Sequence, residues 1–339
     1  MHSCLAPNVL VVRFSSIGDV LLITPLLRAI RRRHPDARIT VLTKGAYTPL
    51  IDDNPNVDEV IALEPGDSLP ALATRIRAAG YTHLLDLHDN LRSRVLRALA
   101  PGPWRSYPMY RAARALLIHA KRDRYPVHRP VAERYFAAAR GLDVHPDGEP
   151  PEFSIGPTAM AAADAWLDET GHSNTRPLVA LAPGAAHATK RWPTEHWRAL
   201  AGRIVEAGTD IVVVGGVGDR AVADQVVAEL GDRSRSAAGL FGLQSTGALL
   251  RRAKALVSGD TGVMHMATGV GTPVVALFGP TVEAFGFFPY TRRAEVVQLD
   301  LPCRPCSSHG GPVCPLGHHH CLELVEPEVV YAALCRSVA

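Results

Sequence analysis

The chain has 339 residues, of which 47% are hydrophobic, and its 36 basic and 33 acidic residues give a formal net charge of +3. This length allows two α/β domains of ordinary size, and the composition excludes a disordered or low-complexity chain. The charge is uneven: residues 1–150 carry 21 Lys and Arg against 15 Asp and Glu, whereas residues 151–339 carry 15 against 18. The basic first half is therefore the better partner for an anionic surface.

The first apolar run of the chain lies at residues 9–12 and is ended by Arg13. It lacks the basic start and long apolar stretch of a signal peptide, so it predicts a first β-strand. No window offers the roughly 18 uncharged apolar residues that would cross a bilayer. We therefore expect a cytoplasmic protein whose six cysteines are reduced or bound to metal.

The first half then alternates between strand and helix patterns. Further strands are predicted at residues 39–42, 60–63 and 84–87, with helices at 21–33 and 69–79. Between 92 and 132 the pattern changes: ten Lys and Arg face one acid, Asp123, with aromatic and aliphatic residues interleaved. A helix at 131–140 leads into the Pro-rich stretch 145–151, which is the best candidate for a linker.

The second half repeats this rhythm. Strands are predicted at residues 178–182, 211–214, 255–257 and 274–278, with helices at 196–207, 221–230, 246–254 and 263–268. Strands separated by helices favour a parallel sheet covered on both faces. We therefore predict an α/β protein of two Rossmann-like, doubly wound domains, residues 1–155 and 156–339. The substrate site is expected in the cleft between them, at the carboxyl ends of the strands.

The first turn that could carry chemistry is Ser15-Ser16-Ile17-Gly18-Asp19, between the first strand and a helix. The simple explanation of Asp19 is that it caps free backbone amides at the helix start. The functional alternative is that Asp19 accepts the proton of an attacking hydroxyl, with Gly18 letting the backbone approach a ligand. The sequence leaves both open.

Three turns of the second half could bind an anion. Residues 183–193 join a buried strand to a helix and include Gly184, Lys190 and Arg191, so they could cradle a diphosphate, although a solvated basic loop is the alternative. Residues 259–265 offer Gly259 and Gly262 around Asp260 and Thr261, where Asp260 could also be a plain helix cap. A further loop follows the strand at 274–278.

The glycine-rich turn 215–219 has the wrong spacing for a dinucleotide-binding G-x-G-x-x-G motif and lies late in the chain. It could still contact a ribose or base through Asp219. No D-x-D triplet occurs that would hold Mg²⁺ under a diphosphate. A nicotinamide-dependent oxidoreductase is therefore disfavoured, and a non-catalytic nucleotide-binding module is a further alternative.

Three segments together resemble glycosyltransferase family nine, the lipopolysaccharide heptosyltransferases: FSSIGDVLLITPLLRAIRRRHPDARITVL, LAPGAAHATKRWP and VSGDTGVMHMATGVGTPVVALFGPT. The likeness runs in order from about residue 8 to residue 325. The resemblance implies a GT-B fold, whose first domain binds mainly the acceptor and whose second binds the nucleotide-sugar. It also implies a metal-independent, inverting transfer of heptose, or a related sugar, from ADP-heptose to the inner core of lipopolysaccharide or a similar envelope glycolipid.

The resemblance also assigns roles to residues. Asp19 matches the family's proposed catalytic base, and Ser15, Ser16 and Gly18 lie beside it on the acceptor side. On the donor side, the matching positions are Gly184, Lys190, Asp219, Asp260, Thr261, Gly262 and His265. Lys190 matches a lysine that contacts the donor diphosphate. Asp219 replaces a glutamate that relatives commonly direct at the nucleoside, and its shorter side chain puts that contact in doubt.

The basic segment 92–132 would face phosphorylated lipid headgroups on the cytoplasmic face of the inner membrane, and its alternative is a solvated loop. A nucleic-acid surface is disfavoured because the segment lies within the acceptor domain of a transferase-like chain.

The C-terminal part carries four cysteines within nineteen residues: Cys303, Cys306, Cys314 and Cys321. The first two form a C-x-x-C pair, which is typical of structural zinc, whereas the second pair lacks a standard spacing. Structural zinc, reduced thiols and redox pairing all stay open. Catalysis is expected to need no metal cofactor.

Overall fold

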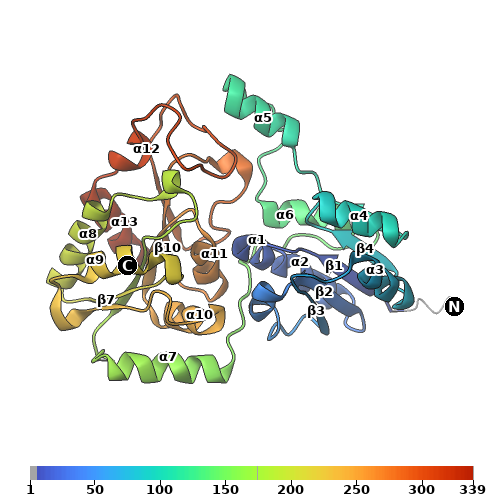
Figure 1. Cartoon of the computed structure of the whole chain (residues 1–339), viewed down its shortest axis with the longest axis horizontal. Helices are drawn as coiled ribbons and strands as arrows, with labels where there is room; N and C mark the ends of the chain where they lie inside the picture. Colours follow the sequence, from blue (N-terminus) through green and yellow to red (C-terminus); the bar gives the residue numbers. More distant parts are fainter. Residues whose placement is uncertain (1–5, 174, 339) are drawn as a thin grey trace. The chain divides into compact units, whose positions relative to one another are not determined.

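The computed structural model describes residues 6–173 and 175–338. By its internal contacts the chain divides into two compact units, Met1–Met109 with Arg129–Ser154 and Tyr110–His128 with Ile155–Ala339. Each unit is built on one parallel sheet with helices packed on it (Figure 1). The segment 110–128, which lies inside the predicted first domain, makes its contacts in the second unit.

The first unit contains a five-stranded sheet in the order β3-β2-β1-β4-β5, and every neighbouring pair is parallel. Its strands are β1 (Asn8–Val12), β2 (Arg38–Lys44), β3 (Glu59–Leu63), β4 (His83–Asp86) and β5 (Trp104–Ser106). The first four confirm the predicted strands to within two residues at each end. The order reverses direction at β1, so the turns after β1 and β4 leave the same edge of the sheet side by side.

The two faces of this sheet follow from the alternation of side chains along each strand. Leu10 and Val12 of β1 pack into a cluster with Ala73, Ile76 and Leu96 from two helices, α3 (Leu69–Ala78) and α4 (Leu91–Leu99). Val9 and Val11 point to the opposite face and are also fully buried. A strand buried on both faces is continuously apolar, which is why the sequence predicts it correctly.

The helices of the first unit are α1 (Ile17–Leu21), α2 (Thr24–Arg33), α3 (Leu69–Ala78), α4 (Leu91–Leu99) and α6 (Val131–Arg134). Short 3₁₀ turns occur at Gly45–Leu50 and Tyr135–Ala139. The predicted helix at 131–140 is thus divided into one α-helical turn and one 3₁₀ segment. Arg28 of α2 ties the linker to this unit, because its guanidinium pairs with Asp147 and Glu152, each at 2.9 Å.

The second unit contains a six-stranded parallel sheet in the order β11-β10-β9-β6-β7-β8. Its strands are β6 (Leu178–Ala182), β7 (Asp210–Val213), β8 (Ser234–Ser236), β9 (Ala255–Gly259), β10 (Val274–Phe278) and β11 (Ala294–Gln298). The four predicted strands form the centre of this sheet, and the two outermost strands were not predicted. The loops after β6, β9 and β10 consequently emerge next to one another.

The helices of the second unit are α5 (Arg111–Ala120), α7 (Pro157–Glu169), α8 (Thr194–Glu206), α9 (Arg220–Val227), α10 (Leu243–Arg252), α11 (Gly262–Gly269), α12 (His320–Glu323) and α13 (Pro327–Val338). Short 3₁₀ turns lie at Ala188–Lys190, Val217–Asp219, Gly231–Arg233 and Glu283–Phe285. The apolar sides of α8, α9 and α13 pack on one face of the sheet in a single buried cluster that includes Trp197.

The segment Tyr110–His128, here called the arm, docks on the second unit through a small apolar cluster. Tyr125 is buried against Ala284 and Phe285, with Leu117 and Ile118 of α5 packed around them. Lys121 adds polar contacts, since its Nζ donates to the backbone oxygens of Cys303 at 2.8 Å and Pro305 at 2.5 Å. In the described part of the chain, every helix is too short or too polar to cross a lipid bilayer.

Candidate active site

Asp19 lies in the first turn of α1, directly after β1, and its carboxylate is held from two sides. The backbone N–H of Ser16 and the hydroxyl of Ser16 donate to Oδ2 at 3.1 and 2.8 Å. Arg13 approaches Oδ1 with Nη2 at 2.5 Å. The predicted capping role is therefore confirmed, because Asp19 accepts a free amide at the start of the helix. Its role as a base stays a prediction.

Arg13 is the residue that the sequence analysis missed at this site. Its side chain is buried at the end of β1, donates from Nε to the backbone oxygen of Ser15 at 2.9 Å and from Nη1 to that of Leu87, and lies over the Tyr135 ring. The guanidinium thus links the turns after β1 and β4 to Asp19. The available signal was a cation placed directly after an apolar strand and shortly before an acid.

Burial acts to raise the pKa of Asp19, but the Arg13 charge and the Ser16 hydrogen bonds outweigh it and hold that pKa below its usual value. The carboxylate is therefore ionised at neutral pH. An ionised aspartate has about four acceptor positions, and Arg13 and Ser16 occupy three of them. One position on Oδ1 is left to accept a proton.

Among the predicted acceptor-side residues, Ser15 and Ser16 act through the contacts just described, whereas Gly18 is buried inside α1. The carbonyl of Gly18 accepts from the Leu22 amide at 2.9 Å. The structure therefore gives Gly18 a helical role, and its predicted approach to a ligand stays a prediction.

In the second unit, Lys190 and Asp260 form an ion pair between the loops after β6 and β9. Lys190 Nζ lies 2.6 Å from Asp260 Oδ2 and donates to the Asp260 backbone oxygen at 3.2 Å. Thr281, in the loop after β10, donates its hydroxyl to the same Oδ2 at 2.7 Å. Three of the predicted strand-end turns thus meet at one buried carboxylate. An anion that binds Lys190 must compete with Asp260 for the ammonium group.

Glycines allow these loops to approach one another. A Cβ on Gly259 would lie 3.0 Å from the backbone oxygen of Lys190. A Cβ on Gly184 would lie 2.1 Å from Asp219 Oδ1, and one on Gly215 would lie 2.8 Å from Asp219 Cβ. Asp219 therefore fills the space that both glycines leave, while its Oδ2 accepts from the Gly216 amide at 2.8 Å. Its nucleoside contact stays a prediction.

The start of α11 carries the remaining donor-side candidates. Thr261 precedes the helix, with its hydroxyl 3.1 Å from that of Ser258, and Gly262 begins it. His265 is only 4% exposed and lies among the buried residues of α11. The structure thus places Thr261 and Gly262 beside Asp260 at the strand end. The contact of His265 with a donor stays a prediction.

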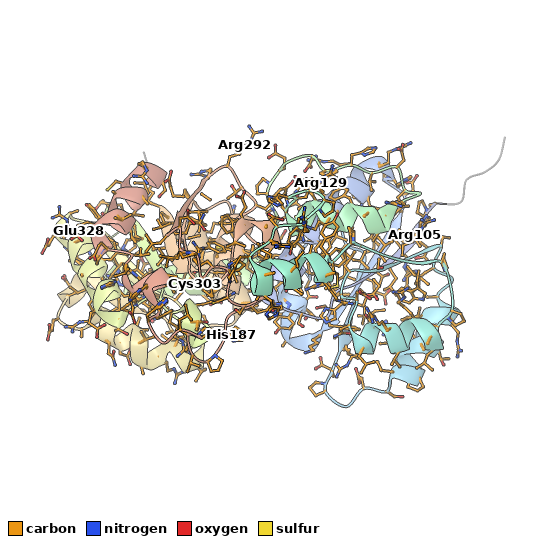
Figure 2. All side chains as sticks on the ribbon, turned by 90° about the horizontal axis from the view of Figure 1, so that it is seen from above. Arg105, Arg129, His187, Arg292, Cys303 and Glu328 are labelled. Atoms are coloured by element: carbon orange, nitrogen blue, oxygen red, sulfur yellow. The ribbon has the colours of Figure 1, made fainter. Side chains whose placement is uncertain are left out.

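The cysteine-rich segment, residues 303–321, packs on the Lys190 loop. Thr189 and Gly311 exchange backbone and hydroxyl hydrogen bonds at 2.8–3.2 Å, and His319 Nε2 lies 2.9 Å from the Thr189 backbone oxygen. A Cβ on Gly310 would meet the side chains of His187 and Lys190 at 2.8 and 3.2 Å. Figure 2 labels His187 and Cys303, which mark the two segments. The cysteine-rich segment therefore supports the loop that carries Lys190.

Arg304 connects the same segment to the loop after β10. Its guanidinium donates to the backbone oxygens of Gly279, Leu299 and Thr281, the last at 2.8 Å. The amide of Cys306 adds a bond to the Pro280 oxygen at 3.2 Å. Residues 303–321 therefore contact two of the three loops that meet at Asp260, namely those after β6 and β10.

The four predicted zinc ligands are free thiols with different environments. Burial and neighbouring thiols raise the pKa of Cys306 and bring that of Cys321 to about 11. Burial also acts to raise the pKa of Cys314, but backbone amides of residues 316–319 outweigh it and lower that pKa. Across residues 6–173 and 175–338, no three His, Cys, Asp or Glu side chains are grouped to hold a metal ion. Structural zinc stays a prediction.

Each unit thus has one polar centre at its strand ends, Asp19 with Arg13 in the first and Lys190 with Asp260 in the second. The prediction that Asp19 and Lys190 line one cleft stays a prediction.

Comparison with known proteins identifies the family of this chain. The model of Glycosyltransferase family 9 (heptosyltransferase) matches residues 70–315. Lipopolysaccharide heptosyltransferase 2 of Salmonella typhimurium is 28% identical over 319 residues, covering 86% of this chain and 88% of that protein.

Two solved structures share the fold over almost the whole chain. The family 9 glycosyl transferase of Veillonella parvula has a TM-score of 0.81 at 25% identity, covering 98% of this chain and 97% of its own. The E. coli ADP-heptose lipopolysaccharide heptosyltransferase II has a TM-score of 0.75 at 25% identity, covering 98% of both chains. The predicted GT-B fold of two parallel-sheet domains is confirmed. The chain belongs to glycosyltransferase family 9, the heptosyltransferases, and is a glycosyltransferase.

Proposed function

We propose that this enzyme transfers heptose, or a closely related sugar, from ADP-heptose to the inner core of lipopolysaccharide. The observation that carries the proposal is the meeting of Lys190, Asp260 and Thr281 at the strand ends of the second unit, where parallel sheets bind their ligands. Relatives of matching length are heptosyltransferases, and one is named for ADP-heptose. The first unit is proposed to bind the acceptor and the second the donor.

The reaction is proposed to be a single displacement. The acceptor hydroxyl attacks the anomeric carbon, the bond from that carbon to the diphosphate oxygen breaks, and configuration inverts. Asp19 takes the hydroxyl proton at the free position of Oδ1. The weak basicity of Asp19 suits this step if the hydroxyl loses its proton late, after positive charge has built up on the sugar.

Charge on the departing ADP is proposed to be met by Lys190 and by backbone amides around residues 184–190 and 260–262. Lys190 would exchange its contact with Asp260 for one with a phosphate oxygen, while Thr281 and the Lys190 ion pair keep Asp260 in place until the donor arrives. These groups would do the work that a divalent cation does in other transferases, so we propose metal-independent transfer.

A thermal-shift panel of nucleotide-sugars tests the donor. A ligand that binds only the native state raises apparent stability, by about 2.7 kcal/mol at a concentration of 100 times Kd. ADP-heptose should raise the melting temperature more than UDP- or GDP-sugars do. Turnover with a lipid acceptor that carries the lipopolysaccharide inner core, followed by NMR of the new anomeric centre, tests transfer and inversion. An equal rise in melting temperature with every nucleotide-sugar would refute ADP-heptose as the donor. Loss of transfer in the presence of a chelator would refute the metal-independent mechanism.

The arm is proposed to contact the anionic headgroups of the cytoplasmic membrane surface, where the acceptor lies. Its exposed residues include Leu116, Arg122 and Arg124, and each basic residue near an anionic bilayer contributes about 1 kcal/mol. Co-sedimentation with phosphatidylglycerol vesicles tests this: R122E/R124E should lose vesicle binding, while charge reversal at Arg292, an exposed loop residue of the same unit, should not. Equal binding by both variants would refute membrane contact through the arm.

A further inference from the structure

His88 follows β4 in the first unit, and its position is fixed by the same strand pair that presents Asp19. Val12 of β1 pairs with Asp86 of β4, and the Leu87 amide donates to the Val12 oxygen at 3.0 Å. The turn 87–90 therefore leaves the sheet beside the turn that begins at Arg13, and Arg13 bonds to the Leu87 oxygen. His88 and Asp19 thus belong to one strand-end cluster.

The turn that carries His88 is firmly held. Asp86 is fully buried, and its Oδ1 accepts the backbone amides of His88 at 3.0 Å and Asp89 at 2.9 Å. The His88 ring packs edge-on against Phe14, with ring centroids 5.1 Å apart. Both the backbone and one edge of the imidazole are therefore positioned before any ligand binds.

The ring nevertheless lacks polar partners. Nδ1 of His88 is buried without a hydrogen bond, and no bond to Nε2 occurs within residues 6–173 and 175–338. Leaving a buried polar atom unsatisfied is unfavourable, and such groups are uncommon in folded proteins. His83, at the other end of the same strand, differs: its Nδ1 lies 2.9 Å from the Thr82 hydroxyl.

Burial and the nearby cations keep this imidazole neutral. Burial, followed by the charges of Arg13 and Lys44, lowers the pKa of His88 to about 4, although Asp19 and Asp86 partly oppose the shift. A neutral ring has one donor and one acceptor nitrogen, so it can bind a hydroxyl without adding charge beside Asp19. A cation here would instead compete with Arg13 for the carboxylate.

We propose that His88 is a second acceptor-binding residue, which hydrogen-bonds the sugar acceptor beside Asp19 and orients its attacking hydroxyl. This inference rests on the proposed function. Asp19 has one free acceptor position, which receives the hydroxyl proton but fixes only one direction of approach. A hydrogen bond from the neighbouring ring supplies a second fixed point on the acceptor, which is what orientation requires.

The test compares variants of His88, which follows β4, with a variant of His83, which begins it. H88F keeps an aromatic ring against Phe14 and removes both nitrogens, H88Q restores a neutral hydrogen-bonding group, and H83F makes the same change at the far end of β4. H88F should raise the acceptor KM about 5- to 10-fold, the loss of one hydrogen bond, with the donor KM unchanged. H88Q and H83F should stay within about twofold of the wild type.

NMR of the imidazole groups gives a readout that does not need turnover. Titration with deacylated inner-core oligosaccharide should shift the His88 signals and leave those of His83 in place. Wild-type transfer with an unchanged acceptor KM in H88F overturns the inference alone. A shift at His88 without any sugar transfer overturns the proposed function and keeps the acceptor contact. If the enzyme shows no sugar transfer and the His88 signals do not shift, both the inference and the proposed function are overturned.

Discussion

Replacing Asp19 by asparagine should separate the two roles that the structure gives this residue. The change removes the base and also leaves the buried Arg13 guanidinium without its counter-ion. Breaking a buried ion pair from one side costs about 3–5 kcal/mol. Arg13 keeps its bonds to the backbone oxygens of Ser15 and Leu87, so we expect the lower end of this range, a loss of about 3 kcal/mol of unfolding free energy.

Turnover of D19N should fall about 10²- to 10⁴-fold, the usual contribution of a general base. The donor Kd should hardly change. Steady-state kinetics at a temperature where circular dichroism shows the variant folded, together with urea unfolding, measure the two effects. R13K is the matched control: it loses the bonds of the guanidinium and some stability but retains the carboxylate, so its turnover should stay within about 10-fold.

The pH dependence of stability gives a second check on D19N. The folded pKa of Asp19 is depressed, so its ion pair stabilises the protein above the unfolded pKa, and this contribution is lost as pH falls through the folded value. Wild type should therefore lose its advantage over D19N below about pH 4. Turnover of D19N within threefold of the wild type, when folded, would refute the assignment of Asp19 as base.

The other predictions concern the second unit. K190A should weaken donor binding or leaving-group stabilisation by about 1.5–3 kcal/mol. The control K254A, at an exposed lysine of the same unit, should change neither. An unchanged donor Kd together with unchanged turnover in K190A would contradict the role of Lys190. G184A should displace Asp219, whose Oδ1 lies 2.1 Å from the added Cβ, and weaken ADP binding measured by calorimetry; wild-type affinity would contradict the packing. Zinc analysis tests the cysteine segment: less than about 0.2 zinc per untreated chain would end the metal proposal, since a structural site is filled as purified.

The sequence was informative wherever burial leaves a continuous pattern. The strand Leu178–Ala182 was predicted to the residue because it is buried on both faces and bounded by Pro177 and Pro183. The outer strands Trp104–Ser106 and Ser234–Ser236 were missed because each has only three residues, most of them polar, which is too short for such a pattern. The arm was read as a basic stretch, since its apolar residues meet Phe285, which lies far along the chain.

The candidate site divides in the same way. The turns that follow the predicted strands indicated where polar residues gather. Asp19, Lys190 and Asp260 were named as candidates for this reason. The contacts between these residues could not be predicted, because the pairing of Lys190 with Asp260 spans seventy residues and depends on strand order. His88 was missed for a related reason: one histidine after a strand is unremarkable until β4 is known to lie beside β1.

The connectivity of the arm has a practical consequence for dissecting the enzyme. Because residues 110–128 leave the first unit and return to it before the chain reaches Ile155, the backbone passes between the units three times. A fragment that begins at residue 155 would expose Ala284 and Phe285, and one that ends there would carry an unsupported α5. To express the units separately, the arm should be removed from the first unit and attached to the second. Truncation at a single point would not separate them cleanly.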